Sequence, residues 1–364
     1  MEIDIVTDYK AILEKMENID PVKYGRTRNY IDGAVTFLSP YISRGVISTK
    51  QILEHVLAKG YKLSQMYFFV RELCWRDYFQ RVGQVKDLNK EIRQPQTAVL
   101  NYEIPTAIIN ANTGITGIDN AIEQLYQTGY MHNHCRMYTS YLACNIAKSH
   151  WYHPAQWMYY HLLDGDWASN FCSWQWVAGA NSSKKYYANQ ENINKYTHTN
   201  QVNTFLDRSY EEIMAMDPPV ELFNTQKFNA EVSLPENSKL KIDAQLPTFI
   251  YNYYNLDPLW RKDEPGNRIL LIEPAFFSAY PVSQKCIDFM LALGKNIPGL
   301  QIYVGSFKSF TDLYETINIY FKEHPLNIGY TGTVEERDWI AENVSGYFPS
   351  FFSYWKNVEK HLKN

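Results

Sequence analysis

The 364-residue sequence lacks several patterns that would place it in familiar classes of protein. It contains no apolar run of membrane-spanning length, and its acidic N-terminal segment has no basic region followed by an apolar run. The five cysteines are scattered without a C-x-x-C pair, which argues against a disulfide framework or an iron–sulfur centre. No glycine-rich loop of the dinucleotide-binding or P-loop type is present. We therefore expect a soluble, cytoplasmic protein with no membrane partner.

An excess of positive charge is also missing. The net charge is −4, which argues against a protein held on nucleic acid by bulk electrostatics alone. Residues 1–200 carry 20 Lys and Arg against 18 Asp and Glu, whereas residues 201–364 carry 15 against 21, so a polyanion would prefer the first part. Aromatic residues are abundant instead, at 15% with 29 Tyr and 9 Trp. A Tyr-rich core explains this figure most simply; a planar ligand, stacked bases or electron hopping are the alternatives.

The chain divides into two textures. Apolar residues at three- and four-residue spacing predict a helical domain over residues 1–215, with helices at 47–57, 64–82, 117–128, 131–148 and 154–163. Residues 216–245 are polar and contain a Pro-Pro pair, which is typical of a linker. In residues 246–364, strands at 248–253, 268–272, 300–304 and 326–330 alternate with helices at 282–293 and 310–321. This alternation predicts a small α/β domain. The fold class is thus mainly α, with a Rossmann-like layer at the C-terminal end.

Two clusters near the start carry polar chemistry. The first is Tyr24–Arg28, followed by Val35-Thr-Phe-Leu-Ser39; hydroxyls and backbone N–H groups in a turn entering a helix suit a phosphate, although they also suit ordinary helix capping. The second lies in Arg71-Glu-Leu-Cys-Trp-Arg76. Glu72, Trp75 and Arg76 share one helical face and would form a wall for a stacked ligand, or simply a surface ion pair beside a tryptophan.

A third cluster is longer and more specific. It runs from Thr128 to Met137, continues through Leu163-Asp-Gly-Asp-Trp-Ala-Ser-Asn170, and ends at Ser173-Trp-Gln-Trp176. Asp166, Asn170 and Trp174 are successive i+4 neighbours if the segment is helical. Carboxylates, an arginine and amides among apolar residues cannot be buried without partners, so they satisfy one another or line a polar ligand.

The motifs TGYMHNHCRM and LLDGDWASNFCSWQWVAG resemble the flavin-binding core of DNA photolyases and cryptochromes, and VTFLSPYISRG and RELCWRDYF resemble its two upstream motifs. The resemblance covers residues 20–187 and implies a helical domain that binds FAD non-covalently in a folded, U-shaped conformation. Asn170 would face flavin N5, where many plant cryptochromes carry Asp. The residues that the resemblance assigns to FAD are Tyr24, Val35, Thr36, Phe37, Leu38, Ser39, Phe69, Glu72, Arg76, Asn133, Arg136, Asp164, Gly165, Asp166 and Asn170.

The resemblance also implies a reaction. In photolyases of cyclobutane pyrimidine dimers, light drives an electron from reduced flavin into a lesion that has left the base stack. The residues that match the lesion contacts are Glu72, Trp75, Asn133, Met137 and Trp176. Trp174 and Trp151 match the first two members of the electron-transfer chain to the flavin. The third member would fall at residues 96–102, where there is no Trp; Tyr102 is one substitute, and routes through Trp157 or Trp167 are others.

The sequence departs from the family elsewhere. The residues expected to contact UV-damaged DNA, single- or double-stranded, are Arg28, Trp75, His134, Trp176, Lys184 and Lys185, where His134 and the two lysines stand in for usual arginines. Only about 20 residues precede the first flavin motif, so we expect neither an N-terminal antenna domain nor an antenna chromophore. The C-terminal α/β part resembles a portion of such a domain. His132, His134 and Cys135, or His150 and His153, do not make a convincing metal site, and none is expected. The alternative function is blue-light signalling of the cryptochrome type without repair.

Overall fold

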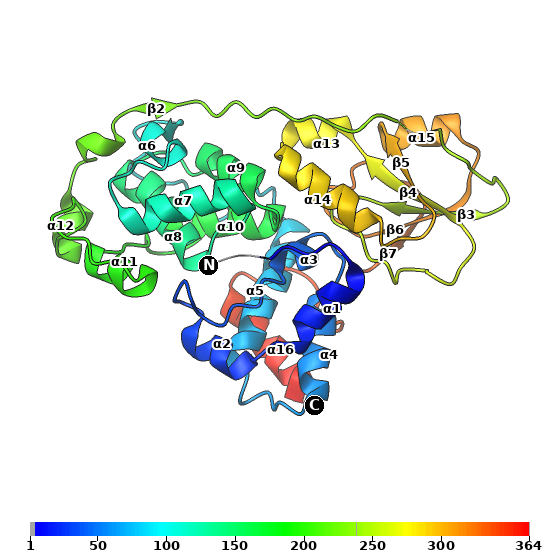
Figure 1. The fold of residues 1–364 in the computed structure, drawn as a ribbon, viewed down its shortest axis with the longest axis horizontal. Helices are drawn as coiled ribbons and strands as arrows, with labels where there is room; N and C mark the ends of the chain where they lie inside the picture. Colours follow the sequence, from blue (N-terminus) through cyan, green and yellow to red (C-terminus); the bar gives the residue numbers. More distant parts are fainter. Residues whose placement is uncertain (1–3, 238, 364) are drawn as a thin grey trace. The chain divides into compact units, whose positions relative to one another are not determined.

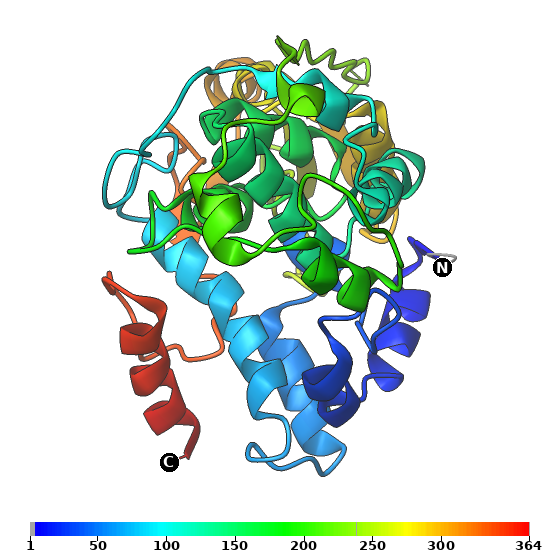
Figure 2. The same cartoon turned by 90° about the vertical axis from the view of Figure 1, so that its left-hand side faces the viewer.

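The computed structural model describes residues 4–237 and 239–363, which form two compact units. The first, here called the helical unit, comprises Val22–Val35 and Val85–Ala230. The second, the mixed unit, comprises Asp4–Pro21, Thr36–Gln84 and the described residues of Glu231–Asn364. Each unit is described by itself, and Figure 1 and Figure 2 show the elements of both.

The helical unit is built around α10, Trp167–Ala178, which packs against α8, Asn133–Tyr141, and α9, Tyr152–His161. The helix α10 begins where the Asp166 side chain accepts a hydrogen bond from the N–H of Ser169, and it ends at Gly179 in the left-handed conformation. The helix α8 continues into a π-helical turn, Leu142–Ile146, so the predicted helix 131–148 is not uniform. The other elements of the unit are most of α2 (Pro21–Thr27), β1 (Ile104–Pro105), α6 (Thr106–Ile109), α7 (Thr116–Thr128), α11 (Gln190–Thr197), α12 (Tyr210–Ala215), η2 (Val220–Leu222) and β2 (Thr225–Gln226).

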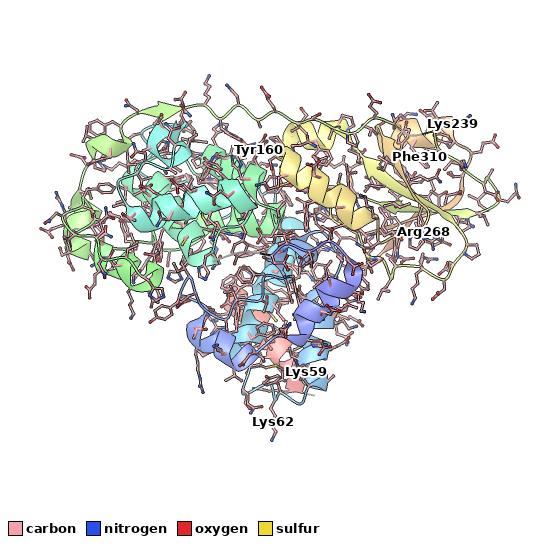
Figure 3. The ribbon with its side chains drawn as sticks, in the orientation of Figure 1. Lys59, Lys62, Tyr160, Lys239, Arg268 and Phe310 are labelled. Atoms are coloured by element: carbon pink, nitrogen blue, oxygen red, sulfur yellow. The ribbon has the colours of Figure 1, made fainter. Side chains whose placement is uncertain are left out.

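The mixed unit combines helices from the first quarter of the chain with a parallel sheet from the last third. The helices are α1 (Tyr9–Glu17), α3 (Ser39–Ser43), α4 (Thr49–Ala58) and α5 (Tyr67–Gly83). The sheet has the order β5-β4-β3-β6-β7, and all its pairs are parallel. Its strands are β3 (Pro247–Tyr251), β4 (Asn267–Ile272), β5 (Leu300–Val304), β6 (Ile317–Lys322) and β7 (Thr333–Glu335), and its helices are α13 (Pro274–Ala279), α14 (Gln284–Gly294) and α15 (Phe307–Leu313). Phe310 of α15 is buried in an apolar cluster with side chains of β3, β4, β5 and β6 (Figure 3).

Contacts between the two ends of the chain hold the mixed unit together. The C-terminal helix α16, Phe351–Lys363, packs against α5, and the buried carboxyl of Asp77 on α5 accepts a hydrogen bond from the N–H of Ile340 at 2.9 Å. The compact units therefore differ from the contiguous division into 1–215, 216–245 and 246–364. That division stays a prediction about which segments are separate domains.

Two sequence expectations for the last third are wrong. The predicted helix 310–321 consists of the end of α15 and the strand β6, and the predicted strand 326–330 is a turn after β6. The segment Ile317-Asn-Ile-Tyr-Phe321 is rich in β-branched and aromatic residues, which favour a strand. The spacing of its apolar residues also fits a helix, because a run this short does not distinguish a helix from a strand.

Candidate functional site

The residues predicted to bind FAD and substrate fall in both units. The mixed unit holds Thr36, Phe37, Leu38, Ser39, Phe69, Glu72, Trp75 and Arg76. The helical unit holds Tyr24, Arg28, Val35, Asn133, His134, Arg136, Met137, Trp151, Asp164, Gly165, Asp166, Asn170, Trp174, Trp176, Lys184 and Lys185.

The helical unit contains an ion pair between a buried carboxylate and a half-buried guanidinium. Arg136 Nη2 donates to both carboxylate oxygens of Asp164, at 3.0 and 2.8 Å, and its Nε donates to the carbonyl of Met131 at 2.8 Å. The side chain of Asp164 is 3% exposed and that of Arg136 is 22% exposed. Arg136 of α8 thus fixes the carboxylate of Asp164, while its own guanidinium remains partly accessible to solvent.

Local contacts position Asn170 of α10 and the turn that precedes this helix. Asn170 is buried and its Nδ2 donates to the carbonyl of Ala155 on α9 at 2.9 Å. Gly165 precedes the helix cap, and a Cβ there would lie 2.9 Å from the carbonyl oxygens of both Leu162 and Tyr159, so only glycine fits this turn. The Oγ of Ser169 and the Nε1 of Trp174 are buried and have no hydrogen-bond partner among the described residues.

The tryptophans of this unit divide into buried and exposed members. Trp151 and Trp174 are almost wholly buried, whereas Trp176 is 39% exposed. From Trp151 a series of rings leads outward: its ring centroid is 5.7 Å from that of His150, which stacks on Tyr102 at 5.0 Å, and Tyr102 is 64% exposed. The segment with no third Trp therefore places an aromatic side chain at the surface.

Hydrogen bonds hold this segment in register with Trp151. Gln96 Nε2 donates to the carbonyl of Ser149 at 2.9 Å, and its Oε1 accepts from the N–H of Trp151 at 2.8 Å. The N–H of His150 donates to the carbonyl of Asn101 at 2.8 Å, and the His150 ring contacts Glu91. The sequence pattern suggested His150 only as a metal ligand, because its position between Trp151 and Tyr102 depends on this pairing between distant segments.

The residues expected to contact DNA differ in how much charge they offer. Burial, with a smaller contribution from the charge of Arg28, lowers the pKa of His134 to about 4, so its ring is neutral near pH 7. Lys185 Nζ donates to the carbonyl of Thr97 at 2.8 Å, and burial lowers its pKa. Lys184 is exposed. Lys184 is thus a freer source of charge for a phosphate than His134 or Lys185.

The remaining predicted residues of this unit lie at or near its surface. Asn133, the first residue of α8, is exposed, and Met137 one turn later is half-buried. Arg28 is half-buried and its Nη1 donates to the carbonyl of Gly25 at 2.8 Å. Tyr24 and Val35 are half-buried.

In the mixed unit, the helix α5 and the segment before α3 carry the predicted residues. Arg76 Nη1 donates to the Oγ of Ser43 at 2.8 Å, which ties α5 to α3. Phe37 adopts a φ of 53° between Thr36 and Leu38, an unusual conformation for a residue other than glycine, and such conformations cluster at functional sites. Leu38 and Phe69 are buried, and Thr36, Ser39 and Glu72 are half-buried.

Trp75 already has a stacking partner. The ring of Phe351 lies parallel to the indole, with centroids 3.7 Å apart and planes inclined by 10°. Phe351 is the first residue of α16 and is 2% exposed. Trp75 is predicted to contact a lesion, and its sequence motif gives no sign of the Phe351 contact, because the two residues are far apart in the chain.

The described residues contain neither a membrane-spanning helix nor a metal-binding cluster. Across residues 4–237 and 239–363, no helix is long and apolar enough to cross a bilayer. Within the same residues, no group of three or more His, Cys, Asp or Glu side chains is arranged to hold a metal ion.

Comparison with known proteins places this geometry in a family. The family described as the FAD binding domain of DNA photolyase matches residues 69–250, which is half of the chain. The chain belongs to the DNA photolyase and cryptochrome family. The match includes the ion pair, α10 with its tryptophans, and nearly all of α5, whereas the segment Tyr24–Ser39 precedes it.

Individual relatives are distant. The deoxyribodipyrimidine photo-lyase of Buchnera aphidicola is 30% identical over 61% of this chain and 47% of its own, and the cryptochrome DASH of Ostreococcus tauri is 32% identical over 48% and 33%. The solved structure of a Synechocystis cryptochrome aligns with a TM-score of 0.45 and 22% identity, over 53% of this chain and 44% of that one. The chain thus spans half or less of the length of these curated relatives.

Proposed function

We propose that the chain binds FAD non-covalently, without an antenna chromophore. The donor set of the helical unit supports this assignment. A flavin's imide edge carries one N–H and two carbonyls, and Asp164 and Arg136 supply a fixed acceptor and a partly open donor. The buried Ser169 Oγ and Trp174 Nε1 are further donors that have no partner among the described residues. The family match to an FAD-binding domain, with the Arg136–Asp164 ion pair inside it, is the observation that carries the proposal.

Six of the predicted residues would then have distinct tasks. Thr36, Ser39 and Arg76 would hold the phosphates, and Asn170 would offer flavin N5 a neutral amide that has no proton to give near pH 7. Trp174 and Trp151, which are both buried, would pass electrons toward the flavin. When bound and reduced, FAD supplies an electron on illumination. These residues would orient the flavin and shield it from water.

We further propose that the reaction is repair of cyclobutane pyrimidine dimers in DNA. Trp176 is exposed enough to stack on a base that has left the duplex, and base–aromatic stacking is worth about 1–3 kcal/mol. Asn133 and Met137 lie on α8 with side chains that solvent reaches, so an amide and a thioether are available to the same lesion. Lys184 would add a phosphate contact.

Signalling of the cryptochrome type without repair is the second candidate. The observation that favours it is the stack of Phe351 on Trp75, because an indole face covered by the chain's own C-terminal helix does not face a lesion. On this reading, α16 is a permanent part of the mixed unit and Trp75 serves packing.

One assay separates the two candidates. The purified, reduced protein is illuminated with blue light together with a thymine oligonucleotide that contains a dimer, and the return of thymine absorbance is followed. If the protein repairs dimers, thymine absorbance returns with the wild type, and Trp176→Ala retains FAD but no longer binds the lesion. Phe223→Ala, which removes an exposed aromatic side chain of the same unit outside the predicted site, should have little effect. Stoichiometric FAD without any return would reject repair; a return in Phe351→Ala alone would show that α16 blocks the lesion.

A further inference from the structure

The parallel sheet of the mixed unit has a point where the direction of strand addition reverses. The chain adds β4 and β5 on one side of β3, and then β6 and β7 on the other. Open sheets of this kind take their ligands beyond the carboxyl ends of the strands at such a point. Here β3 leads into Tyr253 and Tyr254 and β6 leads into His324, and the Tyr254 and His324 rings stack at 4.2 Å with an 11° tilt.

An arginine from elsewhere in the chain inserts at this position. Arg44, the residue that caps the C-terminal end of α3, is 0% exposed. Its guanidinium carbon lies 3.5 Å from the centre of the Tyr253 ring and 5.1 Å from that of Tyr254, and its Nη1 donates to the Tyr253 carbonyl at 3.1 Å. The Arg44 carbonyl in turn accepts from the N–H of Leu256 at 2.9 Å. The ligand-binding edge of the sheet thus holds a side chain of the α3 cap.

The backbone beside Arg44 is equally close to the sheet. At Gly45, which has a φ of +65°, a Cβ would lie 2.4 Å from the carbonyl oxygen of Tyr254. A second anchor comes from Tyr41, which is 0% exposed and whose ring lies 6.0 Å from that of Phe289 on α14. The helix α3 is therefore held to the C-terminal layer both along its length and at its end.

A five-residue helix needs such anchors. Helices shorter than about 12 residues are marginal by themselves in water, so the position of α3 depends on its tertiary contacts. The segment Thr36–Ser39 leads directly into α3, and Ser43 accepts the hydrogen bond from Arg76. Whatever fixes α3 therefore also fixes three side chains assigned to the FAD phosphates.

We propose that the C-terminal α/β layer acts as a positioning module for the flavin-phosphate segment, and that Arg44 is its key positioning residue. This inference rests on the proposed binding of FAD. A buried guanidinium over an aromatic face is a strong but specific contact, because its burial is compensated only while the ring and the carbonyl are in place. The layer would use the edge where related sheets bind a ligand to hold a part of its own chain.

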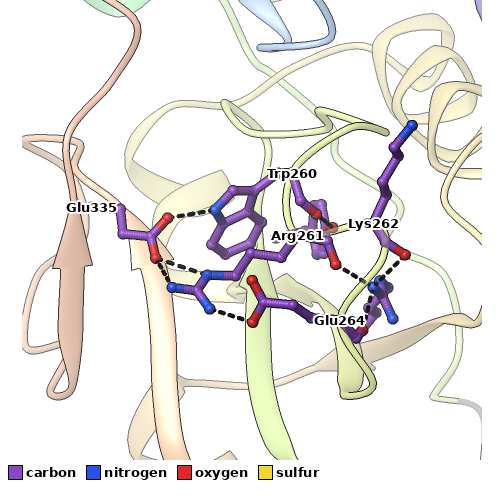
Figure 4. A network of polar contacts seen from close by, with 7 residues as sticks. Trp260, Arg261, Lys262, Glu264 and Glu335 are labelled. Carbon is purple, nitrogen blue, oxygen red and sulfur yellow. Dashed lines mark hydrogen bonds and ion pairs between the residues drawn. The ribbon is translucent and has the colours of Figure 1, made fainter.

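The test compares two arginine-to-methionine variants of the full chain. Arg44→Met keeps an unbranched, flexible side chain of apolar character and removes the positive charge and the hydrogen-bond donors. The control is Arg261→Met, which removes another arginine from an aromatic face of the same sheet: Arg261 lies 3.9 Å over the Tyr320 ring and is paired with Glu335 and Glu264 (Figure 4). Hydrogen exchange of residues 36–45 is measured in the protein freed of flavin, and FAD affinity by titration.

For Arg44→Met we expect exchange in residues 36–45 to accelerate and FAD affinity to fall by about tenfold, as loss of one desolvated cation–π contact implies. Arg261→Met should lower the unfolding midpoint without changing either quantity. Arg44→Lys, which keeps a cation over the ring, should recover part of the affinity, and it carries the test if the methionine variant does not fold.

Equal exchange and equal FAD affinity in wild type and Arg44→Met would overturn the inference, as would equal losses in both methionine variants, since Arg44 would then be only one of several stabilising residues. A wild-type chain that binds no FAD would instead reject the proposed function. In that case the exchange of residues 36–45 still decides whether Arg44 positions the segment.

Discussion

The carboxyl of Asp77 offers a sharp test of how α5 is held. Asp77 is buried, and it accepts from the hydroxyl of Thr49 on α4 at 2.8 Å and from the N–H of Ile340 at 2.9 Å. Burial raises its pKa from the ordinary 3.8 to about 6, against the opposing effects of these two hydrogen bonds and of Arg337 and Arg81. The folded chain therefore retains this proton more tightly than the unfolded chain does.

The sign of the pH dependence follows from that difference. Between pH 3.8 and about 6 the folded state binds the Asp77 proton and the unfolded state has released it, so the free energy of unfolding falls as the pH rises. Above about pH 6 both states are ionised and the whole loss persists. A difference of about two pKa units corresponds to a loss of about 3 kcal/mol.

Asp77→Asn should remove this loss and keep both hydrogen bonds. The amide oxygen can accept from the Ile340 N–H, while the amide nitrogen donates to the Thr49 hydroxyl, which is able to reverse its role. Allowing for lost attraction to Arg81 and Arg337, we expect the variant to be more stable than wild type by about 1–3 kcal/mol at pH 7 and by little near pH 4. Urea unfolding at a series of pH values measures the difference.

A control of opposite sign is available at the same site. Thr49→Val removes a donor to the ionised carboxyl, which should raise the pKa of Asp77 further and extend the fall in stability to higher pH. If the difference between wild type and Asp77→Asn is the same at pH 4 and pH 7, the folded chain does not hold this proton and the reasoning is refuted.

Two further predictions concern the helical unit. Asp164→Asn should destabilise the protein by about 2 kcal/mol, because it leaves the Arg136 guanidinium without its anion, although partial solvent contact of Arg136 limits this cost. A double-mutant cycle with Arg136→Met, measured by urea unfolding, gives the coupling energy between the two residues. Additive effects of the two substitutions would contradict a stabilising ion pair. Tyr102→Phe keeps the ring on His150 and removes the oxidisable phenol, so light-driven reduction of bound FAD by an external thiol should slow severalfold, whereas an unchanged rate would assign the surface end of the path elsewhere.

The sequence predicted the local part of the structure well. The spacing of apolar residues placed α7, α9 and α14 within a few residues, and the i+4 relation of Asp166, Asn170 and Trp174 is confirmed by their place on and at the cap of α10. These features depend on neighbours within one or two turns, which a single sequence displays directly.

The contacts that the sequence did not predict join residues far apart in the chain. The Trp75–Phe351 stack and the Asp77–Ile340 hydrogen bond each link α5 to a segment more than 250 residues later, and nothing in either local pattern names the partner. The same separation explains why the compact units do not follow the contiguous division drawn from composition. Composition reports which segments resemble each other, whereas compactness depends on which segments touch.

This distinction bears on what the motifs can establish. A motif fixes the identity of a side chain, but its chemistry depends on what covers it. His134 is predicted to contact DNA, yet burial lowers its pKa and leaves it neutral, and Trp75 is predicted to contact the lesion, yet Phe351 lies on its face. Trp176 is also predicted to contact the lesion, and its exposed side chain is compatible with that prediction. The proposal of repair therefore depends on Trp176 and α8 more than on α5. Trp176→Ala tests the exposed tryptophan of α10, whereas Phe351→Ala tests whether the stack on Trp75 of α5 blocks a lesion, so comparing the two variants separates these contributions.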